Sequence, residues 1–295
     1  MNKGIQLAIG TALISGFSIF LSKILVSSMD PVVFTTLKNI VVAAILSLFV
    51  FRSRYSTQIK KLSRSDWTRL VLIGIVGGGI PFALFFTGLS MTSAGMGAIL
   101  HKTLFIWIAL LAMPFLHEKL SIAQMVGYVI VLWGVLWTTG IRFTGGTGEL
   151  MVLAATILWA IENVLAKKTI YHVPGIIVAW GRMFFGSLIL LGVLVVTGKL
   201  GLVTEWTPSL FSAFLVSSIL LVGYVVTYYT SLQYIPVTTA SSILVLSAPI
   251  TALLQFGFQG QGISSANLQS YILLVVGVVI VTYLPNLKNI FSKRS

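Results

Sequence analysis

Three charged side chains lie deep inside apolar runs of this sequence, where water does not solvate them. At ~1.5 Å per residue, Lys38 and Arg182 begin roughly 10–12 Å inside such runs, and Glu162 about 9 Å inside another. A buried charge is costly unless it is paired. We therefore predict a Glu162–Arg182 ion pair, and we expect Lys38, Glu162 and Arg182 either to contact a ligand or to brace neighbouring helices.

His101 and Lys102 are the most unusual neighbours in the chain, because they interrupt another apolar run. Histidine exchanges protons near physiological pH. Together the two side chains could bind a carboxylate or a phosphate, or couple the movement of a solute to protons. The alternative is that one extends to an interface while the other forms a hydrogen bond inside the fold.

Polar and aromatic side chains extend this set of candidate binding residues. Trp159, Glu162 and Asn163 share one helical face by their i, i+3, i+4 spacing. Tyr224 and Trp159 are the best candidates for an aromatic cavity wall. An equivalent stripe of serines occurs earlier in the chain, at Ser15, Ser18 and Ser22. Such stripes line cavities or pack helices together, and the sequence leaves both interpretations open.

Glycine and proline interrupt two of the apolar runs. Gly77, Gly78 and Gly79 are followed by Pro81, and Pro249 lies in a later run. Proline removes a helix hydrogen bond and glycine relaxes the backbone. We predict hinges at Gly78, Gly79, Pro81 and Pro249, with ordinary close packing as the alternative.

The elements that carry these residues must be membrane-spanning helices. Of 295 residues, 57% are hydrophobic and only 8% are charged, with a mean hydropathy of +1.02. Soluble domains are roughly one quarter charged, and a helix needs about 20 apolar residues to cross a bilayer. The sequence predicts an all-α membrane protein with ten transmembrane helices, at 4–27, 31–51, 68–90, 94–116, 121–140, 147–168, 174–197, 207–231, 236–258 and 267–285.

The net charge of +13 is distributed as in a membrane protein rather than a nucleic-acid-binding one. Basic residues gather between the second and third helices, from Arg52 to Arg69, and after other even-numbered helices. Because cytoplasmic loops collect Lys and Arg, we predict a multi-pass protein of the cell membrane with both termini cytoplasmic. Its expected partners are the lipid bilayer and a small-molecule substrate, with no nucleic acid and no obligate protein partner.

Cofactor and metal chemistry find little support in the sequence. There are no cysteines, and the three histidines form no metal-binding helix motif. The glycine-rich turn from Gly145 to Gly148 lacks the lysine of a nucleotide-binding loop. We expect no metal and no cofactor, although proton coupling through Glu162 or His101 remains an open alternative.

The two halves of the chain repeat each other. A first repeat over 1–140 is followed by a second over 147–285 and a cytoplasmic tail over 286–295. Matching positions include Leu21 with Leu165, Lys23 with Lys167, Lys38 with Arg182, Ser121 with Ser264, Tyr128 with Tyr271, and Gly134 with Gly277. Because each half has five helices, the second enters the membrane from the other side. Inverted repeats of this kind are typical of secondary transporters.

The repeats also resemble the EamA domain of the drug/metabolite transporter superfamily. The resemblance lies in the turn from Phe115 to Ser121 with its following glycine-containing helix, and in the segments 231–242 and 248–250. The sequence departs from the family pattern in three places. His117 stands where glycine is usual, 259–262 lacks the acid of this turn, and Ser247-Ala248-Pro249 lacks the acid often found in the ninth helix.

By this resemblance the protein would export small organic metabolites by alternating access. The surplus of Lys38, Lys102 and Arg182 over Glu162 favours solutes with a carboxylate or phosphate, such as amino acids. A lipophilic cation held by Glu162 and aromatic rings is the alternative. An intramembrane enzyme is disfavoured, because no paired aspartates or Ser-His-Asp arrangement lies at one depth.

Overall fold

Helices make up the fold throughout the described part of the chain. The structure, a computed structural model, describes residues 2–26, 30–137, 143–203 and 208–292, and it has no strand in these ranges. The predicted join between the repeats runs from Gly140 to Gly148, and its residues 140–142, including Arg142, lie outside the described residues, as do residues 293–295 of the predicted tail. So do the side chains of Ser22 and Lys23.

The first half of the chain forms five helical spans. The first two are α1 (Lys3–Val26) and α2 (Pro31–Arg52), followed by the short connecting helix α3 (Tyr55–Ile59). The third span consists of α4 (Arg64–Ile73), a π-helical segment η1 (Gly74–Gly79) and α5 (Ile80–Ser90). The fourth consists of α6 (Ala94–Lys102) and α7 (Leu104–Leu116), and the fifth is α8 (Ile122–Trp137).

The second half repeats this order. Its first two spans are α9 (Thr147–Ile170) and α10 (Gly175–Val196), and a 3-10 turn, η2 (Lys199–Val203), follows. Next comes α11 (Pro208–Ser231), then α12 (Val237–Leu244) with α13 (Ser247–Gln259), and finally α14 (Ser265–Ser292). Nine segments of the described chain are long and apolar enough to cross a membrane, and α8 is a shorter apolar helix. The predicted fold class is confirmed.

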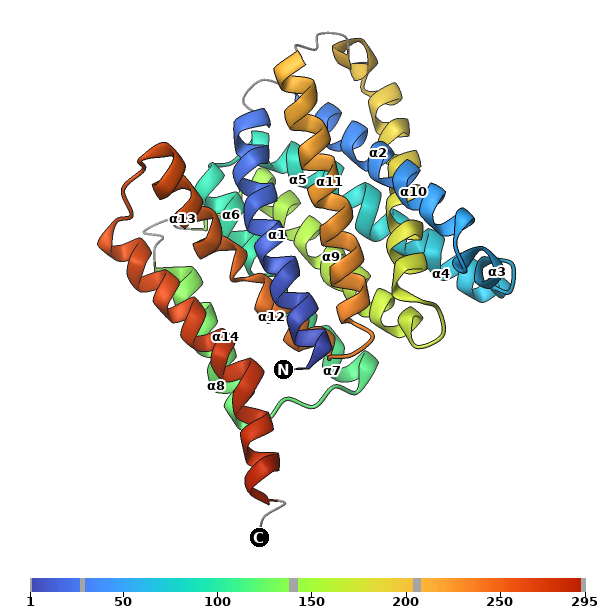
Figure 1. Cartoon of the computed structure of the whole chain (residues 1–295). Helices are drawn as coiled ribbons and strands as arrows, with labels where there is room; N and C mark the ends of the chain where they lie inside the picture. Colours follow the sequence, from blue (N-terminus) through green and yellow to red (C-terminus); the bar gives the residue numbers. More distant parts are fainter. Residues whose placement is uncertain (1, 27–29, 138–142, 204–207, 293–295) are drawn as a thin grey trace.

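Packing between the halves follows the repeat. Helix α1 lies along α11, and their counterparts α9 and α5 pack in the same way. Helices α2 and α10 pack against each other, as do α8 and α14, which form a pair at one side of the bundle (Figure 1). Both termini lie towards the lower side of this view. We call this side the terminal face and the other the opposite face.

Two spans are broken at equivalent depths. The fourth span breaks at Thr103, between α6 and α7, and the ninth breaks at Val245 and Leu246, between α12 and α13. Thr103 and Leu246 are repeat equivalents, offset like Tyr128 and Tyr271. His101 and Lys102 directly precede the first break. The break in the fourth span thus places His101 and Lys102 at the end of a helical segment part-way along the span.

The fourth and ninth spans also end in the same way. His117 caps α7 with φ 55°, and Gly260 caps α13 with φ 63°. The following N–H groups donate to the carbonyls of Ala112 and Gln255, respectively. A left-handed residue after a helix is usually glycine, because it has no Cβ to clash. Among the described non-glycine residues, His117 alone has a positive φ, so the first repeat retains the turn despite an unfavourable residue.

Candidate functional site

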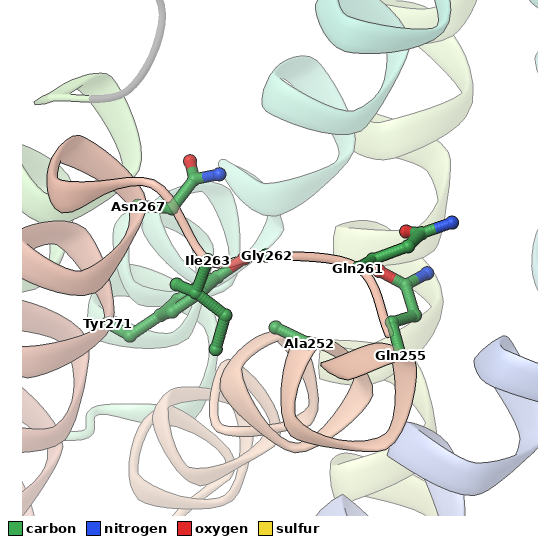
Figure 2. Close-up of a pocket in the computed structure, with 7 residues that line it drawn as sticks. All are labelled: Ala252, Gln255, Gln261, Gly262, Ile263, Asn267 and Tyr271. Atoms are coloured by element: carbon green, nitrogen blue, oxygen red, sulfur yellow. The ribbon is translucent and has the colours of Figure 1, made fainter. Parts of the chain in front are cut away.

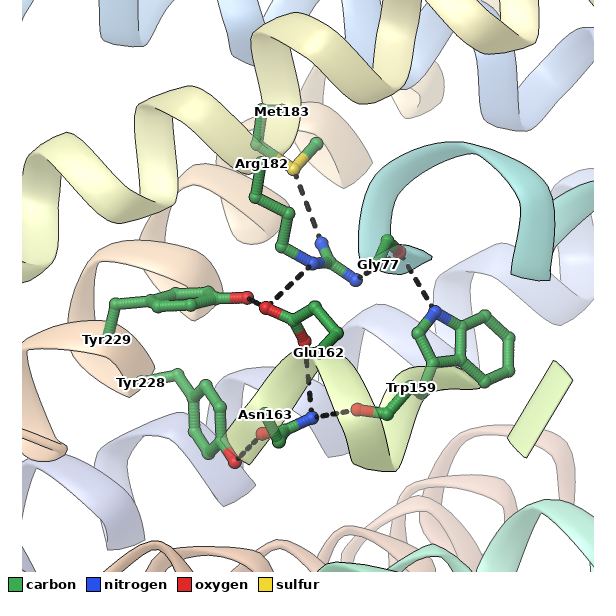
Figure 3. A network of polar contacts seen from close by, with 8 residues as sticks. All are labelled: Gly77, Trp159, Glu162, Asn163, Arg182, Met183, Tyr228 and Tyr229. Carbon is green, nitrogen blue, oxygen red and sulfur yellow. Dashed lines mark hydrogen bonds and ion pairs between the residues drawn. The ribbon is translucent and has the colours of Figure 1, made fainter. Parts of the chain in front are cut away.

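The Gly77 carbonyl is the centre of a buried polar network. In a regular α-helix this oxygen would accept from residue 81, but Pro81 has no N–H. The backbone forms the π-helical segment η1 here instead. Two side chains from other spans donate to the Gly77 oxygen: Trp159 Nε1 at 3.0 Å and Arg182 Nη2 at 3.0 Å (Figure 3). The break in the third span therefore creates an acceptor that ties α9 and α10 to η1.

Glu162 and Arg182 form the ion pair that the sequence predicts. Arg182 Nε lies 3.9 Å from Glu162 Oε1, and the Glu162 residue is only 1% exposed. The same carboxylate oxygen accepts a hydrogen bond from the Tyr229 hydroxyl, and the other accepts from Asn163 Nδ2 at 3.2 Å. Both Glu162 oxygens thus have partners, and the two buried charges compensate each other.

Asn163 links the ion pair to a row of tyrosines on α11. Its Nδ2 also donates to the Trp159 carbonyl at 2.8 Å, and its Oδ1 accepts from the Tyr228 hydroxyl (Figure 3). Tyr224 stacks on Tyr228, with ring centroids 5.9 Å apart. The candidate residues Trp159, Asn163 and Tyr224 thus come together.

Two more tyrosines complete this network, Tyr228 and Tyr229. The sequence offers both as aromatic candidates for a cavity wall, behind Trp159 and Tyr224, but does not pair them with Asn163 and Glu162. Tyr228 lies four residues after Tyr224, on the same helical face, and that spacing was the available signal. The sequence offers no comparable signal for the bond between Tyr229 and Glu162.

His101 continues the group on the other side of Trp159. Its ring lies 4.9 Å from Trp159 and 5.4 Å from Phe85 by centroid distance. Its Nδ1 is buried and has no hydrogen-bond partner in the described structure. Lys102 is half-buried as the last residue of α6. A buried ring nitrogen without a hydrogen-bond partner in the described structure therefore lies next to an aromatic wall, and Lys102 is the next residue along α6.

The predicted hinge glycines are packed tightly against α10. A Cβ on Gly78 would lie 2.3 Å from the Arg182 carbonyl oxygen, and one on Gly186 would lie 2.4 Å from Gly78 Cα. Gly79 similarly faces Ile189. These contacts provide the close packing named as the alternative for Gly78 and Gly79. A hinge role for these glycines and for Pro81 stays a prediction.

Pro249 lies in the first turn of α13, directly after the break in the ninth span. A proline is tolerated in the first turn of a helix, where its missing N–H costs little. A hinge role for Pro249 also stays a prediction.

Lys38 occupies the position on α2 that Arg182 occupies on α10. Its ammonium lies 5.4 Å from the centroid of the Phe34 ring. The repeat equivalent of Glu162 is Ser18, so the ion pair of the second repeat has no carboxylate counterpart in the first. The structure therefore places Lys38 and Arg182 in different environments despite their equivalent positions.

Two repeats of five spans, broken helices and a buried charged network define a polytopic membrane protein of the transporter type. Known proteins identify it further. The model of the EamA-like transporter family matches residues 2–140 and again 146–283. The chain belongs to this family, a member of the drug/metabolite transporter superfamily.

Several relatives support the same conclusion. An uncharacterized transporter of Methanothermobacter thermautotrophicus is 24% identical over 284 residues, covering 90% of this chain and 82% of that protein. The uncharacterized transporter YoaV of Bacillus subtilis is 26% identical over 251 residues, covering 83% and 84%. A crystal structure of a protein with 15% identity shares the fold, with a TM-score of 0.82 over 96% of this chain and 98% of that chain. The family and these names indicate a transporter rather than an enzyme.

Proposed function

We propose that this transporter moves small organic solutes bearing a carboxylate or phosphate, such as amino acids, by alternating access. We further propose that it exports them across the cell membrane, with both termini and the terminal face on the cytoplasmic side. The basic residues from Arg52 to Arg69 support this orientation, because positive residues collect in cytoplasmic loops. The solute would leave the protein chemically unchanged.

The observation that carries the substrate class is the position of His101 and Lys102 at a helix break. Discontinuous helices near the middle of the membrane commonly form the solute and ion sites of transporters. Lys102 is the last residue of α6, where a positive charge also suits the helix dipole. Its ammonium group can hold an anionic solute, while Trp159 and Phe85 beside His101 offer an apolar wall.

The charge balance of the network favours an anionic solute over the alternative, a lipophilic cation. A cation would need the Glu162 carboxylate, whose oxygens already accept from Tyr229 and Asn163 and face Arg182. Releasing them would leave Arg182 as a buried unpaired charge, which is costly. Lys102 has no acidic partner within 4.0 Å among the described residues. The positive charge beside the break therefore suits an anion.

The test is uptake by the purified protein reconstituted alone in liposomes, because the proposal needs no cofactor or partner protein. Lys102→Met is compared with Lys168→Met, which removes an exposed lysine of α9. A lost charge-assisted hydrogen bond of ~1.5–3 kcal/mol predicts at least a tenfold weaker affinity for amino acids or phosphate esters in Lys102→Met. Equal affinities in both variants would refute the role of Lys102. Preferential transport of lipophilic cations would refute the substrate class.

The same liposomes address the driving force. We propose that His101 is the proton-coupling group if transport follows a pH gradient, because its Nδ1 is buried without a hydrogen-bond partner in the described structure. Uptake is measured with and without a pH gradient, in the wild type and in His101→Gln. Gradient-driven accumulation that persists in His101→Gln would exclude this role, and rates independent of the gradient would indicate facilitated diffusion.

A further inference from the structure

At the terminal face, a carboxylate of the first repeat holds the start of a helix of the second. Glu118, in the connection between α7 and α8, accepts from the backbone N–H groups of Val237 at 2.8 Å and Thr238 at 3.2 Å. It also accepts from the Thr238 hydroxyl at 2.6 Å. These donors form the first turn of α12, where backbone N–H groups lack helical partners and the helix dipole favours a negative charge.

Two further side chains hold the same segment. The Tyr128 hydroxyl of α8 donates to the Thr238 carbonyl at 2.7 Å. Lys167 of α9 donates to the Ile235 carbonyl at 2.9 Å and to the Leu232 carbonyl. We call Glu118, Tyr128 and Lys167 the terminal latch. The latch joins the start of α12 to three other parts of the fold.

At the opposite face, residues of the second repeat take the place of two members of the latch. The repeat equivalents of Glu118 and Tyr128 are Gln261 and Tyr271. Both side chains line a pocket, together with Ala252, Gln255, Gly262, Ile263 and Asn267 (Figure 2). The pocket lies where α13 ends and α14 begins, which is the opposite face.

Helix packing also differs between the two faces, and it is closer at the terminal face. At the terminal face α12 packs against α7. The equivalent pair at the opposite face is α6 and α13, and these described helices do not pack against each other in the same way. Among the described residues, the fourth and ninth spans therefore pack more closely at the terminal face than at the other.

We infer that the terminal latch is a gate of the transport cycle, and that Glu118 makes the two gates unequal. This inference rests on the proposed alternating access. In the other state of the cycle, each repeat would take the conformation of its counterpart. The opposite face would then be closed by Gln261, which takes the place of Glu118. An amide offers one acceptor oxygen and no charge, so this second gate is weaker than the carboxylate gate. The resting protein therefore favours the state that is closed at the terminal face.

The experiment uses the natural absence of cysteine, which allows single reporters without further changes. Ser241→Cys places a thiol on α12, where Ser241 is 4% exposed behind the latch. Ala252→Cys places one in the pocket of the opposite face. The reaction rate of each with a membrane-impermeant maleimide is measured from each side of the membrane. We expect Glu118→Gln to accelerate labelling of Ser241→Cys from the terminal side about tenfold, and to slow labelling of Ala252→Cys from the opposite side.

Glu149→Gln is the matched control. The Glu149 carboxylate also accepts from two backbone N–H groups and a threonine hydroxyl, those of Thr144 and Gly145. These bonds join the first turn of α9 only to the segment directly before it. The Glu149→Gln variant should leave both labelling rates unchanged. Thr238→Val removes a single bond of the latch and should act in the same direction as Glu118→Gln, so a folding defect in one variant does not decide the result.

Two results would overturn the inference: unchanged labelling of Ser241→Cys in folded Glu118→Gln and Thr238→Val, or equal acceleration in Glu149→Gln. Because labelling needs no solute, these results are independent of the substrate class. A protein that gates as expected but moves no carboxylate or phosphate would disprove only the proposed substrates.

Discussion

Removing the Glu162 carboxylate should destabilise the fold far more than its single ion pair suggests. In Glu162→Gln, Arg182 stays buried and keeps its bond to the Gly77 carbonyl, but it loses the negative charge 3.9 Å away. Two unit charges about 4 Å apart attract by ~4 kcal/mol at an effective dielectric constant of ~20. Removing one partner of a buried pair typically costs ~3–5 kcal/mol.

The pair itself is expected to contribute much less, because both charges must be desolvated. The double variant, Glu162→Gln with Arg182→Met, replaces both charged side chains, so that no uncompensated charge stays buried. Trp159 still donates to the Gly77 carbonyl, so this oxygen keeps a partner. We therefore expect the double variant to lose ~2 kcal/mol less free energy of unfolding than the two single variants lose together. This coupling lies within the range for contacting residues.

The assay is a double-mutant cycle on the free energy of unfolding in mixed micelles of a mild and a denaturing detergent. Wild type, both single variants and the double variant are compared at one protein concentration. Additive losses would show that Glu162 and Arg182 are not coupled. A loss below about 1 kcal/mol in Glu162→Gln would show that Arg182 is solvated after all, and the description of the network as buried would fail.

Two further predictions concern the loops. His117→Gly should stabilise the protein by roughly 0.5–1 kcal/mol, because it relieves a left-handed residue, and Gly260→His should destabilise it; unfolding of both variants checks this. Partial burial alone would raise the pKa of Asp30, but the Lys199 ammonium at 2.7 Å and two backbone N–H groups lower it. A lowered folded pKa means that the stabilisation is present above about pH 4 and is lost as the pH falls through the folded pKa. The stability difference between wild type and Asp30→Asn, which keeps a capping side chain, should therefore vanish in acid.

Much of the fold could be predicted because membrane helices follow simple rules of length and polarity. The Glu162–Arg182 pair could also be predicted, since two buried charges of opposite sign at similar depth on consecutive spans have few other partners. The run from Gly77 to Pro81 correctly indicated an interruption. Its π-helical form did not follow from the sequence, because it depends on Trp159 and Arg182 reaching the Gly77 carbonyl from other spans.

The terminal latch was beyond sequence reasoning for a similar reason. Glu118 was recognised as part of a turn, but its partners Val237 and Thr238 lie in the other repeat. No local pattern relates positions so far apart in the chain. The sequence did show that residues 259–262 lack the acid of this turn, and the structure shows what the acid of the first repeat, Glu118, contacts. The break at Thr103 was likewise missed, because neither glycine nor proline marks it.

Reciprocal movement of the two faces would test alternating access most directly. Spin labels at Lys119 and Tyr234 span the terminal face, and labels at Gly262 and Met91 span the opposite face at repeat-equivalent positions. When a transported solute is added, we predict that a new population with a longer distance appears for the pair at the terminal face. A new population with a shorter distance should appear for the pair at the opposite face. The two changes should appear together. Distances that stay fixed, or that change in the same direction at both faces, would contradict a single pathway exposed to each side in turn.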